Sequence, residues 1–136
     1  MELTPYLVFN GDCATAFKFY EKALGGKIIM MQTHGESPMK DQTPADWQNR
    51  ILHARLTVGD QVLMGSDSPP QDYHKPEGFS VSLSVKKAEE AERVFKALSE
   101  SGSVQMPLEK TFWAERFGML TDRFGVPWMV NCDLPA

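Results

Sequence analysis

The chain has 136 residues, of which 42% are hydrophobic and 24% charged, and its net charge is −4. This length fits one domain, and the apolar content argues against a disordered chain. No basic patch is visible, so nucleic acid is not an expected partner. No apolar run approaches the roughly 20 residues of a membrane span. Without a signal-peptide pattern, and with only Cys13 and Cys132 as cysteines, the chain is predicted to be cytoplasmic with reduced thiols.

The first half of the chain begins with a strand and a helix. An apolar run at 5–9 predicts the strand, and Asp12 offers an N-cap for a helix over 14–24. The glycine pair at 25–26 ends that helix. Further strands are predicted over 27–33, 51–58 and 61–66, the last two joined by the two-residue turn Gly59-Asp60. Residues 34–50 are typical of a long polar loop, and such loops are often functional.

The second half repeats this order of elements. Strands are expected over 79–85, 104–108, 112–121 and 126–131, with a helix over 88–98 that Gly102 closes. At an offset of 74 residues, Lys22-Ala23-Leu24 matches Lys96-Ala97-Leu98. The shared order carries more weight than the few identities. We predict one domain of two modules, 1–67 and 79–136, joined by a linker over 68–78.

Several motifs resemble a known superfamily. They are Pro5-Tyr-Leu-Val-Phe-Asn-Gly11, Thr111-Phe-Trp-Ala-Glu-Arg-Phe-Gly118 and Asp122-Arg-Phe-Gly-Val-Pro-Trp-Met-Val-Asn131. The chain resembles the vicinal oxygen chelate superfamily of glyoxalase I, extradiol dioxygenases and bleomycin-resistance proteins. It is most similar to the PhnB-like branch, some members of which carry a 3-demethylubiquinone methyltransferase label. The resemblance implies an α+β fold in which two βαβββ modules form a cupped eight-stranded mixed sheet. It also implies helices on the convex face, a ligand cleft in the concavity, and a homodimer.

Metal-dependent members of this superfamily use His and Glu ligands on the first and fourth strands of each module. Spacing places the corresponding positions at Pro5, Met64, Ser80 and Met129. Proline has no donor, and a thioether suits soft ions such as Cu(I). We therefore predict no metal and no other cofactor. Glyoxalase-type isomerisation and extradiol oxygenation are both disfavoured, because each needs a metal.

Strand alternation predicts which side chains line the cleft. The Gly59-Asp60 turn places Arg55 opposite Met64 and His53 opposite Ser66, while the other row, Leu52, Ala54, Leu56 and Val58, packs under a helix. A bulged turn at Gly125 pairs Met119 with Met129 and Phe117 with Asn131 in the second module. The predicted ligand-binding residues are Arg55, Met64, Ser66, Trp113, Phe117, Met119, Met129 and Asn131, and the predicted catalytic residues are His53 and Glu115.

Each of these residues has a second interpretation. His53 is either a general acid and base or a histidine satisfied by backbone hydrogen bonds. Arg55 either binds an anionic ligand or forms an ion pair with Glu115. The aromatic and thioether side chains are either a ligand platform or ordinary core.

Four functions therefore compete. The first is a metal-independent protein that binds a hydrophobic or anionic small molecule. The second is an enzyme that uses His53 and Glu115 for proton transfer, and the third is a dimer module without a ligand. Methyl transfer is disfavoured, because the common S-adenosylmethionine fold needs a doubly wound sheet with a glycine-rich first turn, which this chain lacks.

Overall fold

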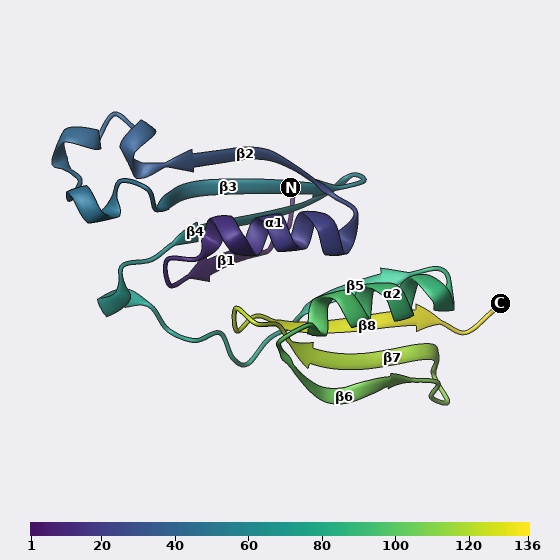
Figure 1. The fold of residues 1–136 in the computed structure, drawn as a ribbon. Coiled ribbons are helices and arrows are strands. Elements are labelled where there is room, and N and C mark those ends of the chain that lie inside the picture. The colour runs from purple at the N-terminus through teal and green to yellow at the C-terminus, as the bar shows by residue number, and fades with distance from the viewer. The chain divides into compact units, whose positions relative to one another are not determined.

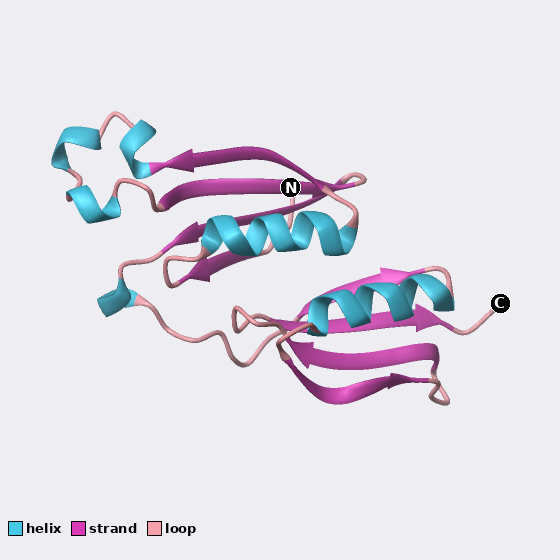
Figure 2. Ribbon diagram, viewed as in Figure 1, coloured by secondary structure: helices cyan, strands magenta, loops and turns pink.

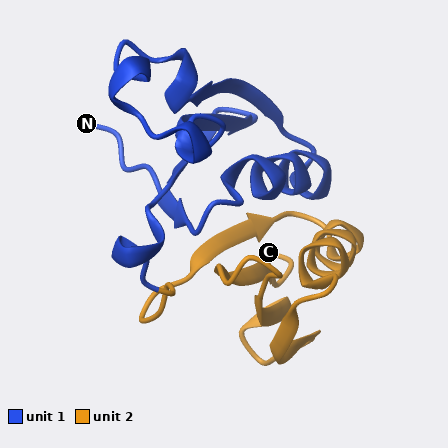
Figure 3. Cartoon of the chain, turned by 60° about the vertical axis from the view of Figure 1, so that its left-hand side comes forward, with its two compact units in different colours: residues 1–74 blue, residues 75–136 orange.

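The chain folds into two compact units of similar construction. The computed structural model describes residues 1–136 and divides them into unit 1, Met1–His74, and unit 2, Lys75–Ala136 (Figure 3). The boundary falls within the predicted linker. Each unit has the strand and helix order βαβββ, with its helix packed on a four-stranded mixed sheet (Figures 1 and 2). This is the α+β class with two βαβββ modules that the resemblance implies, and the strands form two four-stranded sheets.

In unit 1 the sheet has the strand order β1-β4-β3-β2, with β1 parallel to β4 and the other pairs antiparallel. Its elements are β1 (Tyr6–Phe9), α1 (Cys13–Leu24), β2 (Lys27–Thr33), β3 (Ile51–Val58) and β4 (Gln61–Asp67). Gly25 ends α1 in the left-handed conformation at φ 69°, as the glycine pair predicts. The helix buries Ala16, Phe17 and Tyr20 completely.

Asp67, at the end of β4, connects three segments of unit 1. Its buried carboxylate accepts hydrogen bonds from the backbone N–H groups of Cys13 at 2.9 Å and of Ile51 at 2.8 Å. These bonds satisfy one otherwise unpaired donor at the start of α1 and one at the start of β3. One side chain therefore fixes where the helix and the central hairpin begin.

Residues 34–50 form three short 3-10 helices, His34–Glu36, Lys40–Gln42 and Ala45–Trp47, rather than an irregular loop. The two ends of the segment are joined, because the backbone N–H of His34 donates to the carbonyl of Arg50 at 2.9 Å. The guanidinium of Arg50 also donates to the Gly11 carbonyl at 2.7 Å and stacks over Trp47. The segment is thus an ordered extension of unit 1.

In unit 2 the strand order is β5-β8-β7-β6, the same arrangement as in unit 1. Its elements are β5 (Val81–Val85), α2 (Ala88–Ser99), β6 (Ser103–Glu109), β7 (Ala114–Thr121) and β8 (Pro127–Asp133). Asp122 is buried in the β7–β8 turn and accepts from the N–H groups of Phe124 and Val126 and from the Trp128 indole. These bonds hold the turn at Gly125, whose φ is +88°.

In each unit one aromatic ring of the helix packs directly on a glycine of the sheet, but the two glycines lie on different strands of the hairpin. A Cβ atom added at Gly65 on β4 would lie 2.7 Å from the ring of Phe17, and one added at Gly118 on β7 would lie 2.7 Å from the ring of Phe95. Gly65 pairs with Ala54, whereas Gly118 pairs with Val130. The two units therefore reach similar helix packing with the small residue on opposite strands of the central hairpin.

Several predicted boundaries shift, most by one or two residues. β5 begins at Val81 rather than at 79, and β7 begins at Ala114 rather than at 112. α2 ends at Ser99, and the turn that follows uses Ser101 at φ 59°, so Gly102 is not itself the left-handed residue. Instead, a Cβ at Gly102 would lie 2.4 Å from the Thr121 carbonyl oxygen, so close approach between backbones requires glycine there. No helix in the structure has the length and apolar character needed to cross a membrane.

Candidate functional site

The sheet of unit 1 has one face covered by α1 and one open face. Ala54 and Leu56 lie in the covered row and are fully buried, as predicted. Leu52, predicted in the same row, is 37% exposed, because the β2–β3 register shifts beside it, between Gln32 and Thr33. Arg55 pairs with Met64 across the β3–β4 hairpin, and on β2 the partners of Arg55 and His53 are Met30 and Gln32. We define the open face of unit 1 by seven side chains of this row around Arg55: Tyr6, Met30, Gln32, His53, Arg55, Met64 and Ser66.

The sequence pattern did not assign Tyr6, Met30 or Gln32 to this face, and Tyr6 is the one of the three that contacts His53. It pairs with Met64 in the parallel β1–β4 ladder and therefore projects to the same side as Arg55. Its hydroxyl lies 3.2 Å from Nδ1 of His53 in a hydrogen bond, and the two rings stack with centroids 5.7 Å apart. The alternation with Leu7 and Phe9, which are buried under α1, would have assigned Tyr6 to this face. His53 is thus held by a side chain rather than by backbone bonds.

Arg55 has a guanidinium without a protein partner. Its Nε atom is buried and makes no hydrogen bond, and within unit 1 Arg55 takes part in no ion pair. A buried donor without an acceptor is unusual, because nearly all such groups in native proteins are paired. The predicted alternative, an Arg55–Glu115 pair, would join unit 1 to unit 2 and stays a prediction; within unit 2, Glu115 pairs with Lys110 and Arg116.

The open face of unit 2 has the register that the bulged turn predicts. Met119 pairs with Met129 and Phe117 with Asn131, while Ser82 and Ser84 on β5 lie beside Met129 and Asn131. Trp113 precedes β7, and its ring packs edge to face on Phe117 with centroids 5.6 Å apart. Trp113 is 48% exposed. Thioether, aromatic and amide groups are thus together and accessible on one face.

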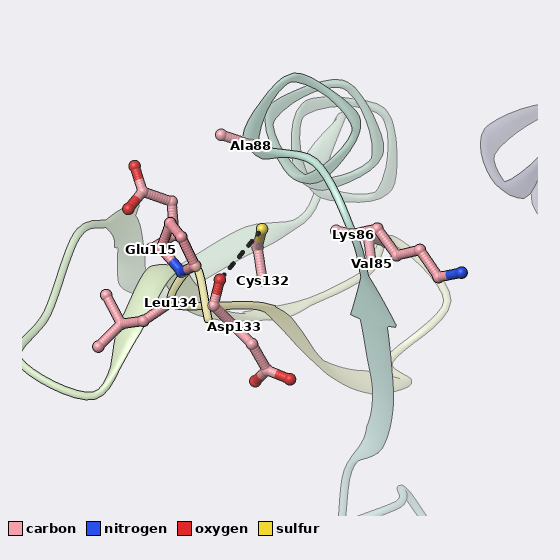
Figure 4. Close-up of a pocket in the computed structure, with 8 residues that line it drawn as sticks. Val85, Lys86, Ala88, Glu115, Cys132, Asp133 and Leu134 are labelled. Carbon is pink, nitrogen blue, oxygen red and sulfur yellow. Dashed lines mark hydrogen bonds between the residues drawn. The ribbon is translucent and has the colours of Figure 1, made fainter.

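Glu115 lies apart from the regular alternation of β7. The β7–β8 register is interrupted between Ala114 and Arg116, so a bulge removes Glu115 from the row of Phe117 and Met119. Its side chain borders a pocket of about 430 Å³ at the carboxyl ends of β5 and β8, beside the start of α2 (Figure 4). The carboxylate pairs with Lys110 at 3.8 Å and with Arg116 at 3.4 Å. Glu115 belongs to unit 2 and His53 to unit 1, so their joint catalytic role stays a prediction.

The superfamily's metal positions lack suitable donors in this chain. In the sheets, the first-strand neighbours of Met64 and Met129 are Tyr6 and Ser82, rather than Pro5 and Ser80. The offset between the first strands is thus 76 residues (82 minus 6), because the connection from strand to helix is shorter in unit 2. A thioether with a hydroxyl in each unit does not match the imidazole and carboxylate set of such a site. Nor do three His, Cys, Asp or Glu side chains gather anywhere in a group that could hold a metal.

Comparisons with known proteins agree on one family. The family described as 3-demethylubiquinone-9 3-methyltransferase matches residues 1–131. Protein YjdN of Escherichia coli (strain K12) is 35% identical, over 96% of this chain and 95% of that protein. The crystal structure of PA1353 from Pseudomonas aeruginosa is 54% identical, with a TM-score of 0.90 over 98% of both chains. A Bacillus cereus protein described as a PhnB protein, at 24% identity, has a TM-score of 0.80 over 97% of this chain and 99% of that one, and so shares the fold.

Proposed function

The chain belongs to the 3-demethylubiquinone-9 3-methyltransferase (PhnB-like) family, with the fold of the glyoxalase and fosfomycin-resistance superfamily, and from this premise we propose that it binds a small molecule without a metal. The ligand would lie on the open faces of the sheets, against methionine and aromatic side chains. Such surfaces, with a few polar groups among apolar ones, are typical of small-molecule sites. Methyl transfer receives no support from the chain itself, since the β1–α1 connection carries the single glycine Gly11.

The unpartnered guanidinium of Arg55 is the observation that carries this proposal. A purely structural face would pair or omit a charged group whose Nε is buried. An accessible face that keeps such a group beside the flexible side chains of Met30 and Met64 suits a ligand that completes its hydrogen bonds. The ligand we propose combines an apolar body with an anionic group.

An enzymatic function remains the second candidate, because His53 is held by the Tyr6 hydroxyl in a fixed orientation. An imidazole in such a pair can transfer protons near neutral pH. The partner predicted for it, Glu115, pairs with Lys110 and Arg116 instead. In this alternative, His53 would act on the ligand that Arg55 binds. Loss of turnover with retained binding in His53→Gln would support it.

The binding proposal can be tested by NMR on methionine methyl groups. Two probes share a fused aromatic ring system: anionic 8-anilinonaphthalene-1-sulfonate and neutral N-phenyl-1-naphthylamine. We expect saturable shifts of the Met30, Met64, Met119 and Met129 methyls with at least one probe. Met39, exposed in the 34–50 segment, serves as an internal control and should not shift. Absence of shifts with both probes, or equal shifts at Met39, would contradict ligand binding at the open faces.

A further inference from the structure

We propose that Arg55, His53 and Tyr6 form an oxyanion site on the open face of unit 1, which holds a carboxylate or similar anionic group of the ligand. The inference rests on the proposed binding function and defines the chemical class of the ligand at one end. Arg55 supplies the permanent charge, His53 a second donor, and Tyr6 positions His53. The structure joins the last two through the 3.2 Å hydrogen bond to Nδ1.

The first argument is the number of free donors on Arg55. A guanidinium has five N–H donors in a planar fork that matches the two oxygens of a carboxylate. No hydrogen bond or ion pair in the chain uses them, and burial of Nε prevents solvent from replacing the missing acceptor there. A bound oxyanion would supply the acceptor that the fold omits.

The second argument is the charge of the surrounding strands. No side chain that shares the row of Arg55 is acidic, and its other basic groups are Lys27, opposite Thr57, and the imidazole of His53. By strand, the row holds Tyr6 and Val8 on β1, Lys27, Met30 and Gln32 on β2, His53 and Thr57 on β3, and Val62, Met64 and Ser66 on β4. Of the carboxylates near the ends of these strands, Asp67 accepts from Cys13 and Ile51 on the other side of the sheet, and Glu36 accepts from Thr33. No acidic side chain of this row competes for the guanidinium.

The third argument concerns the orientation of His53. A neutral imidazole that accepts the Tyr6 hydroxyl proton at Nδ1 carries its own proton on Nε2. Since His53 and Arg55 are two residues apart on one strand, both project to the open face. The free Nε2–H is thus a second donor to a ligand on Arg55.

The test compares the two naphthalene probes, which differ in the sulfonate, by fluorescence titration. Wild-type protein is expected to bind the sulfonate more tightly, and Arg55→Gln should weaken the sulfonate roughly tenfold or more while leaving the neutral probe unchanged. Arg116→Gln is the matched control, because Arg116 already pairs with Glu92 and Glu115, and it should change neither affinity. His53→Phe, which removes the Nε2–H donor, should weaken sulfonate binding and leave the neutral probe unchanged.

Tyr6→Phe tests the positioning role separately. In wild-type protein the ¹⁵N spectrum of His53 should show the Nε2–H tautomer, and in Tyr6→Phe a mixture of tautomers together with weaker sulfonate binding. An unchanged tautomer would overturn the role given to Tyr6. These signals come from folded protein, so they separate a lost hydrogen bond from lost structure.

The outcomes distinguish the two proposals. If both probes bind and Arg55→Gln changes neither, the oxyanion site is wrong and ligand binding stands. If neither probe binds, the binding function fails for such ligands, and benzoate and inorganic phosphate are titrated while the Nε–H resonance of Arg55 is observed. A saturable shift of that resonance would support the oxyanion site although the proposed binding of aromatic ligands has failed. Absence of a shift would overturn the oxyanion site too.

Discussion

Replacing Arg55 by methionine should stabilise the protein while it abolishes selectivity for anions. The buried Nε of Arg55 has no acceptor, and an unsatisfied buried donor costs about 1–3 kcal/mol. Methionine has a similar unbranched stem and would lie between Met30 and Met64, its neighbours in the β2–β3–β4 register. Because Arg55 is only partly buried, we expect the lower end of the range, a gain of about 1 kcal/mol in the free energy of unfolding.

Such a gain corresponds to a rise in the melting temperature of roughly 3–6 °C for a protein of this size, measurable by calorimetry. Arg116→Met supplies the control of opposite sign, because it breaks the 3.2 Å pair with Glu92 and the 3.4 Å pair with Glu115. That variant should lose up to about 1 kcal/mol. A fall in the melting temperature of Arg55→Met would refute the reasoning, since it would show that the guanidinium has a stabilising partner within the protein.

Three further predictions concern the framework. Asp67→Ala, which removes the acceptor for the Cys13 and Ile51 N–H groups, should cost about 3 kcal/mol or more in urea unfolding, and Asp67→Asn less. Gly118→Ala should cost about 1–3 kcal/mol by the same measurement, because its Cβ would press on the ring of Phe95 and on the backbone of Leu108; a neutral result would mean that both α2 and β6 shift freely. Burial raises the pKa of the Cys13 thiol, so iodoacetamide at pH 8 should modify it only after unfolding. Because the thiol has a higher pKa in the folded than in the unfolded protein, the free energy of unfolding should fall as the pH rises above the ordinary thiol pKa. Cys13→Ala removes this group, so the loss of stability at alkaline pH should be smaller in that variant.

The hairpin of unit 1 is the part of the site that local sequence determines best. The alternation from Ile51 to Val58 and the Gly59-Asp60 turn leave one register in which apolar side chains face a helix. The Arg55–Met64 pairing follows from these two features. In unit 2 the bulged turn at Gly125 likewise predicts the observed pairing of Met119 with Met129.

Other features depend on contacts that no local pattern records. The parallel pairing of β1 with β4 is set by packing of α1, so the neighbour of Met64 is Tyr6, one residue beyond the position that spacing predicts. The bulge at Glu115 interrupts an alternation that appears regular in the sequence. The missing acceptor at Arg55 is a property of all the strands around it, and only the assembled sheet reveals it.

The glycines under the aromatic rings of the two helices, Gly65 and Gly118, limit how the two halves of the chain can be recombined. In unit 1 the small residue under the aromatic ring is on β4, opposite Ala54, and in unit 2 it is on β7, opposite Val130. The two halves share a topology, but the contact surface between helix and sheet differs, so the helix of one half does not fit the sheet of the other. Grafting one helix onto the other sheet would leave its ring above the wrong strand, so a tandem protein built from two copies of one half needs the helix and hairpin exchanged together.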